Sequence, residues 1–134
     1  MSRDIELLTQ FLQDKFKELK QKYEEQYKPK TIILTTTHRT PEEQYILYKQ
    51  GRLTEGKIVT NCDGFIKMSL HNNYPATAFD ICVIEDGKAI WTPRDYIEAG
   101  VIGLEIGINW GIKLNKNTID YPHYQEYEKE IDNA

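Results

Sequence analysis

The chain has 134 residues, 28% of them charged, and its formal net charge at pH 7 is −4. This length is typical of a single core, so we expect residues 1–134 to form one domain. The basic residues are not clustered, which argues against nucleic-acid binding. No window is long and apolar enough for a membrane span, so we expect no stable membrane association.

The N-terminal residues are acidic and amphipathic, unlike the charged-then-apolar pattern of a secretory leader. We therefore expect a protein that is cytoplasmic on synthesis, in a reducing compartment. The two cysteines, Cys62 and Cys82, could be bridged or free, and a reducing compartment favours free thiols.

The first half of the chain predicts two helices and one strand. Residues 4–27 carry apolar side chains at the three-to-four spacing of a helix with one buried face: Leu8, Leu12, Phe16, Leu19 and Tyr23. Residues 31–37 are rich in β-branched side chains and predict a strand. Thr40, Pro41 and Glu43 then predict a helix start with a capping box, and that helix is expected to end near Gly51.

The second half predicts a hairpin, a third helix and two further strands. A strand over residues 76–84, a turn at 85–87 and a strand over 88–91 form the predicted hairpin. A helix over 93–105 and strands over 108–110 and 121–125 follow. Because helices and strands do not alternate regularly, we expect an α+β fold with a mostly antiparallel sheet and flanking helices.

The candidate chemistry is carried by two of the three histidines. His71 lies in a predicted loop, Asp80 lies on the strand that follows it, and His123 belongs to a later predicted strand. Two imidazoles and one carboxylate, with a fourth position open to water, are typical of catalytic zinc rather than structural zinc. Asp120, three residues before His123, is the candidate base for the attacking water. The sequence therefore predicts a small zinc hydrolase.

These residues resemble a known family, the zinc peptidases of bacterial cell walls. The family includes D-alanyl-D-alanine carboxypeptidases and the L-alanyl-D-glutamate endopeptidases of phage and prophage lysis. Its pattern Ser-x-His, Ala-x-Asp and Asp-or-Glu-x-x-His is matched by three pairs of residues: Ser69 and His71, Ala78 and Asp80, and Asp120 and His123. Two further blocks, at residues 37–52 and 59–64, agree with the family in the same order.

The resemblance implies a Zn²⁺ cofactor, a peptidoglycan stem peptide as substrate, and the fold shared by hedgehog signalling domains and D-Ala-D-Ala metallopeptidases. The Asp-type block before His123 resembles the endopeptidase branch, so the leading hypothesis is an L-alanyl-D-glutamate endopeptidase acting as an endolysin. The alternatives are a D-alanyl-D-alanine carboxypeptidase and a non-catalytic zinc-containing binding or signalling module of the same fold. No linker or repeat is visible, so no separate wall-binding module is expected.

Arg39 is the candidate for stabilising the oxyanion or gripping a substrate carboxylate, because its planar guanidinium is always charged. The alternative role is a salt bridge with Glu42 or Glu43 at the helix start. Four more residues are candidates for orienting the site or touching substrate, each with a structural alternative: Ser69, Gln44, His38 and Trp110.

Overall fold

The computed structural model describes residues 1–111, 113–115 and 118–126, and for residues 113–115 and 118 it describes the backbone alone. In this part of the chain the α-helices are α1 (Gln10–Gln26), α2 (Pro41–Lys49) and α3 (Pro93–Glu105). The strands are β1 (Thr31–Thr36), β2 (Ala78–Glu85), β3 (Lys88–Ile90), β4 (Asn109–Trp110), β5 (Lys113–Asn115), β6 (Thr118–Ile119) and β7 (His123–Gln125). Two short 3-10 turns complete the order, η1 (Ile5–Leu7) and η2 (Leu70–Asn72).

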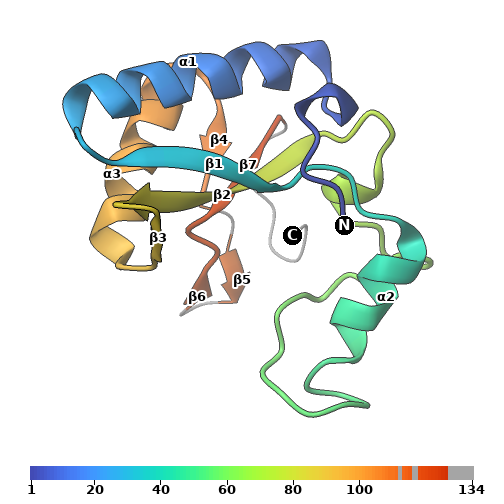
Figure 1. The fold of residues 1–134 in the computed structure, drawn as a ribbon. Helices are drawn as coiled ribbons and strands as arrows, with labels where there is room; N and C mark the ends of the chain where they lie inside the picture. Colours follow the sequence, from blue (N-terminus) through green and yellow to red (C-terminus); the bar gives the residue numbers. More distant parts are fainter. Residues whose placement is uncertain (112, 116–117, 127–134) are drawn as a thin grey trace.

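The main sheet has the strand order β1-β2-β7-β4, and β3 also pairs with β2. Every pairing between these strands is antiparallel. Strands β5 and β6, which the sequence did not predict, form a separate antiparallel pair. Helix α1 lies along one side of the sheet. Helix α2 and the loop after it project beyond the C-terminal end of β1 (Figure 1). The predicted α+β fold with a mostly antiparallel sheet is confirmed.

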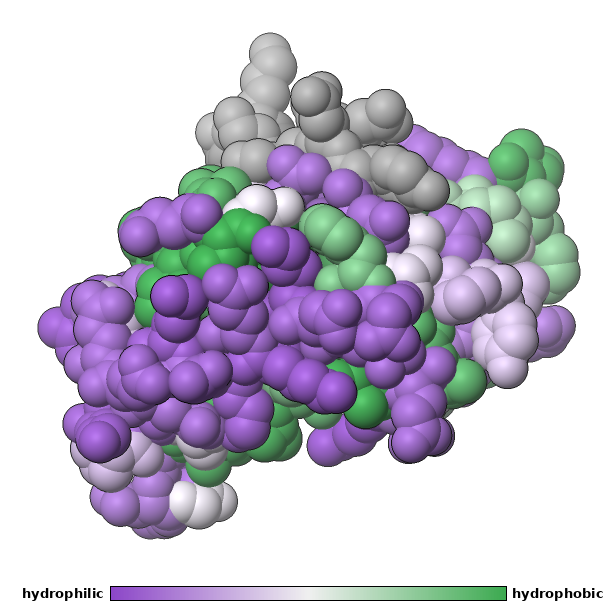
Figure 2. Space-filling model, turned by 90° about the horizontal axis from the view of Figure 1, so that it is seen from above, coloured by the Kyte–Doolittle hydropathy of each residue, from purple (hydrophilic) through white to green (hydrophobic). Residues whose placement is uncertain are grey.

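The core lies between α1, α3 and the sheet. Helix α1 buries the predicted apolar stripe, namely Leu12, Phe16, Leu19 and Tyr23. Polar side chains dominate the surface seen from the side of α1 (Figure 2). An amphipathic helix of this kind is stabilised mainly by tertiary packing, because burying its apolar face removes that surface from water. In the described residues, no helix combines the length and apolarity needed to cross a membrane.

The predicted start of the first helix, near residue 4, is wrong. Helix α1 begins at Gln10, and the Thr9 side chain caps it by accepting a hydrogen bond from the Leu12 backbone. The chain before it turns because Leu8 forms a parallel bridge with Ala76, which lies far away in sequence. Leu8 is buried in the core although it lies before the helix. Its apolar side chain therefore fitted the helical spacing in the sequence and made the predicted helix too long.

The other predicted boundaries lie close to the observed ones. The Thr40 and Glu43 capping box is present, and α2 ends at Lys49, just before Gly51. Helix α3 spans the predicted residues 93–105. The hairpin between β2 and β3 has a two-residue turn in which Asp86 and Gly87 have φ of 52° and 74°, the conformation that this tight turn requires. Both cysteines are free and buried.

Helix α3 approaches the sheet closely at Gly100. A Cβ built on Gly100 would lie 2.1 Å from the Trp110 ring. The ring cannot easily give way, because its Nε1 donates a 2.7 Å hydrogen bond to the Tyr121 carbonyl. Glycine at this position therefore sets the distance between α3 and strand β4.

We expect Gly100→Ala to destabilise the protein by about 1–3 kcal/mol through overpacking, although alanine is otherwise about 1 kcal/mol better than glycine in a helix. The measurement is the free energy of unfolding in urea. The matched control is Val101→Ala, an exposed position on the same helix, which we expect to change stability by at most about 0.5 kcal/mol. Unchanged stability of Gly100→Ala would contradict the close packing described here.

Candidate metal centre and active site

The turn η2 holds His71 in place. Ser69 caps this turn: its hydroxyl accepts a 3.1 Å hydrogen bond from the His71 backbone N–H, and its own N–H donates to the Asn72 side chain at 2.8 Å. The Asn72 amide also donates to the Arg39 carbonyl, and the Arg39 N–H donates to the His71 carbonyl, both at 2.9 Å. Ser69 thus lies beside His71 as a backbone cap, and Asn72 links His71 to Arg39.

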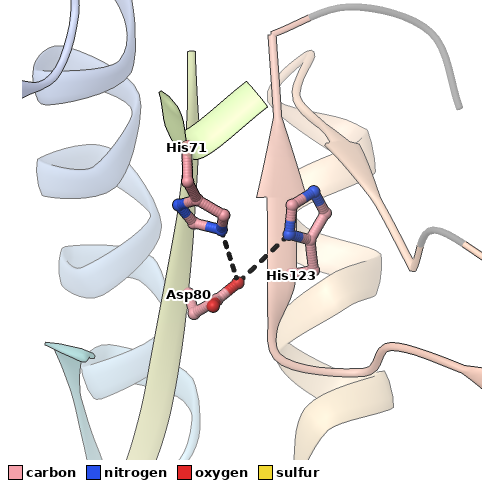
Figure 3. Close-up of side chains that lie close together, drawn as sticks. All are labelled: His71, Asp80 and His123. Atoms are coloured by element: carbon pink, nitrogen blue, oxygen red, sulfur yellow. Dashed lines mark hydrogen bonds and ion pairs between the residues drawn. The ribbon is translucent and has the colours of Figure 1, made fainter. Parts of the chain in front are cut away.

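Strand pairing brings the other two candidate ligands together. Asp80 on β2 is directly opposite His123 on β7 in the antiparallel register. Residues opposite each other in such a pair project on the same face of the sheet. The Asp80 Oδ1 lies 3.1 Å from the His123 Nδ1 and 3.3 Å from the His71 Nε2 (Figure 3). One potential ligand atom from each of the three residues lies within 4.8 Å of the other two.

The electrostatics of the cluster suit a metal cation. Burial raises the pKa of Asp80, but the charges and hydrogen bonds of His71 and His123 outweigh it and hold that pKa below its usual range. Burial lowers the pKa of His71 and favours its neutral form. Burial also lowers the pKa of His123, but the hydrogen bond and negative charge of Asp80 outweigh it and raise that pKa, so a metal would have to displace the proton on this ring. Metal binding requires a carboxylate and neutral imidazoles. The donor set therefore fits a catalytic zinc ion, with His71, Asp80 and His123 as the residues that would hold it.

Asp120 is near the cluster without being part of it. It lines a cleft of about 280 Å³ together with Arg39, His71 and Asp80. Burial, followed by the negative charge of Asp80, raises the pKa of Asp120 to about 6. A carboxyl group with a pKa close to neutrality is suited to both accepting and returning a proton.

Arg39 lies in the same cleft and is buried. Its Nη1 donates a 2.8 Å hydrogen bond to Gln44 Oε1, its Nη2 lies 3.8 Å from Asp80 Oδ2, and its Nε faces the Met1 sulfur at 3.1 Å. The alternative hypothesis of a helix-start salt bridge with Glu42 or Glu43 is wrong within the described residues, where Glu43 closes the capping box instead. The hydrogen bond to Gln44 at Nη1 orients the guanidinium, and its Nη2 faces the candidate ligand Asp80.

The remaining candidates are placed differently. Gln44 is buried and also donates to the Thr60 hydroxyl and the Cys62 carbonyl, so it joins Arg39 to the loop that forms one wall of the cleft. The His38 ring packs edge-on against Tyr74, with 5.1 Å between ring centroids. Trp110 packs against α3 and is absent from the residues lining the cleft.

Two groups behind the histidines were not predicted from the sequence. The His71 Nδ1 lies 2.9 Å from the Thr37 carbonyl, and the His123 Nε2 lies 2.8 Å from Gln125 Oε1. Gln125 follows His123 by two residues on a predicted strand, and that spacing places both side chains on one face. The two-residue spacing on a strand could therefore have predicted that Gln125 lies beside His123. The contact with the Thr37 backbone carbonyl could not have been predicted, because it does not depend on the type of side chain.

A scan against protein-family models found no match. Comparison with curated proteins found a relative in Bacillus subtilis (strain 168), the peptidoglycan L-alanyl-D-glutamate endopeptidase CwlK, which is 34% identical over 103 residues. The family resemblance predicted from the motifs is therefore confirmed. The matched region covers 70% of this chain, and the chain spans 59% of the length of that relative.

Proposed function

We propose that this protein is a zinc-dependent peptidoglycan endopeptidase that cleaves the L-alanyl-D-glutamate bond of the stem peptide, as a phage or prophage endolysin does. The observation that carries the proposal is the convergence of His71, Asp80 and His123 beside a cleft that also holds Asp120 and Arg39. The similarity to an L-alanyl-D-glutamate endopeptidase supports the choice of bond.

The proposed chemistry divides between the metal and the side chains of the cleft. Bound zinc would supply Lewis acidity and lower the pKa of a water molecule to about 7. Asp120 accepts a proton from the attacking water on its carboxylate and then passes it to the leaving amine. Arg39 offers a fixed positive charge to the oxyanion or to a substrate carboxylate. Gln44 keeps the guanidinium oriented while substrate enters, because it holds Nη1 from behind.

The bond that is cut distinguishes the proposed function from its alternatives. Purified cell-wall sacculi are incubated with the protein, and the released fragments are analysed by mass spectrometry. The proposal predicts peptides with a new N-terminal D-glutamate, whereas a carboxypeptidase would release free D-alanine. A protein that retains zinc and releases no fragment would be a non-catalytic module, and the proposal would be wrong.

We expect the protein purified without added metal to contain close to one zinc per chain. Replacing all three proposed ligands, His71, Asp80 and His123, by alanine should abolish zinc binding in elemental analysis. His38→Ala is the matched control, because His38 is the remaining histidine of the chain and lies outside the cluster. Wild-type zinc content in the triple variant would contradict the assignment.

Asp120→Ala should retain zinc and lose roughly 100-fold or more of the wall-degrading activity, as expected for a general base. The comparison variant is His123→Ala, which should lose zinc and activity together. Both quantities are measured on the same preparations, by elemental analysis and by sacculus hydrolysis. An empty metal site in Asp120→Ala would identify Asp120 as a ligand, and the base would then be another group.

Arg39→Lys keeps the positive charge and removes the planar guanidinium, which can donate two hydrogen bonds to one anionic group. Hydrolysis should fall about 10- to 1000-fold, which corresponds to about 1–4 kcal/mol of transition-state stabilisation. Arg39 is buried and bonded to Gln44, so we expect Arg39→Lys to lower the melting temperature as well.

The matched control is Arg52→Lys, the same substitution in an exposed residue that bonds to backbone carbonyls of Tyr48 and Thr60. This control should hydrolyse sacculi at close to the wild-type rate. Equal activity of wild type and Arg39→Lys would remove Arg39 from the proposed chemistry.

A further inference from the structure

Gln125 contacts the ring of His123 from the side opposite to Asp80. Its Oε1 lies 2.8 Å from the His123 Nε2, while the His123 Nδ1 lies 3.1 Å from Asp80 Oδ1. Both Gln125 and His123 are buried, with 0% and 1% of their surface exposed. Water therefore does not compete for this ring nitrogen, and the amide is its partner.

The backbone around Gln125 is fixed on both sides. Strand β7 runs between β2 and β4, and Gln125 is paired with Ala78 on one neighbour and with Asn109 on the other. His123 and Gln125 are two residues apart on this strand, so their side chains project on the same face. The backbone that carries the Gln125 amide is thus held in place by the strands on both sides.

The His123 Nδ1 is within hydrogen-bond distance of the Asp80 carboxylate, and the contact with Gln125 decides which ring nitrogen of His123 would be free to bind a metal at the cluster. A metal binds the neutral ring, which carries one hydrogen, and an amide oxygen only accepts hydrogen bonds, so in that form the hydrogen is on Nε2 and Nδ1 is left for the metal. The opposite arrangement holds for His71, where the Thr37 carbonyl accepts from Nδ1 at 2.9 Å and leaves Nε2 facing Asp80. The two rings therefore direct different nitrogens, Nε2 of His71 and Nδ1 of His123, toward Asp80 Oδ1.

We propose that Gln125 is a positioning residue that selects the Nε2–H tautomer of His123 and holds its Nδ1 ready to bind the metal. This inference rests on the zinc site of the proposed function. An amide performs this role without adding a third negative charge beside Asp80 and Asp120. Partners behind metal-binding histidines fix the tautomer and ring orientation, and losing one typically weakens metal binding about 10- to 100-fold.

The test compares Gln125→Met, which keeps the size of the side chain and removes the acceptor, with Gln125→Glu, which keeps an acceptor oxygen. Zinc affinity is measured by competition with a chelator, and the imidazole ¹⁵N signals are recorded on the zinc-loaded protein. We expect Gln125→Met to bind zinc about 10- to 100-fold more weakly and to lose the protected Nε2–H signal. Gln125→Glu should restore zinc affinity to within about threefold of wild type, because the hydrogen-bond acceptor is back in place.

Gln13→Met is the matched control, since Gln13 is a partly buried glutamine on α1 whose amide bonds to the Leu8 carbonyl. It should bind zinc as wild type does. Circular dichroism identifies the folded variants, and a folded Gln125→Glu with weak zinc binding would overturn the inference even if Gln125→Met failed to fold. Equal affinities of wild type and Gln125→Met would overturn this inference alone, whereas a wild-type protein that binds no zinc would overturn the proposed function with it.

Discussion

The pairing of β2 with β7 is the constraint on which the candidate site depends. Asp80 and His123 are separated by 42 intervening positions, and the antiparallel register places them directly opposite each other. A shift of one residue in this pairing would turn His123 to the other face of the sheet and remove it from the cluster. The apolar neighbour Phe79 stacks on Tyr124 on the opposite face, so core packing and site geometry specify the same register.

Hydrogen bonds behind the reactive groups make a polar cluster possible in a buried setting. Three of the candidate groups have a hydrogen-bond partner on the side away from the cluster: Thr37 for His71, Gln125 for His123, and Gln44 for Arg39. A buried polar group without such a partner is costly. Within the described residues, the buried side-chain atoms that lack a hydrogen-bond partner are the hydroxyls of Tyr23 and Tyr124, both in the core cluster.

Local sequence signals predicted much of this structure, and the failures share a physical cause. Helix caps such as Thr40, the hairpin turn at Asp86 and Gly87, and the apolar stripe of α1 depend on nearby residues, and all were predicted. The start of α1 was wrong because the bridge between Leu8 and Ala76 joins distant segments. The partner of Arg39 was missed for the same reason, since Gln44 takes its orientation from Thr60 and Cys62 in a loop. Ligand types were readable from the sequence, whereas the groups that orient them depend on tertiary structure.

X-ray absorption spectroscopy at the zinc edge of the loaded protein tests the central claim most directly. The account predicts two imidazole nitrogens at about 2.0–2.1 Å and a carboxylate oxygen at about 2.0–2.2 Å from the zinc, with no sulfur bound to it. A sulfur neighbour at about 2.3 Å would contradict it, because the metal would then be bound by Cys62 or Cys82 instead of the cluster of His71, Asp80 and His123.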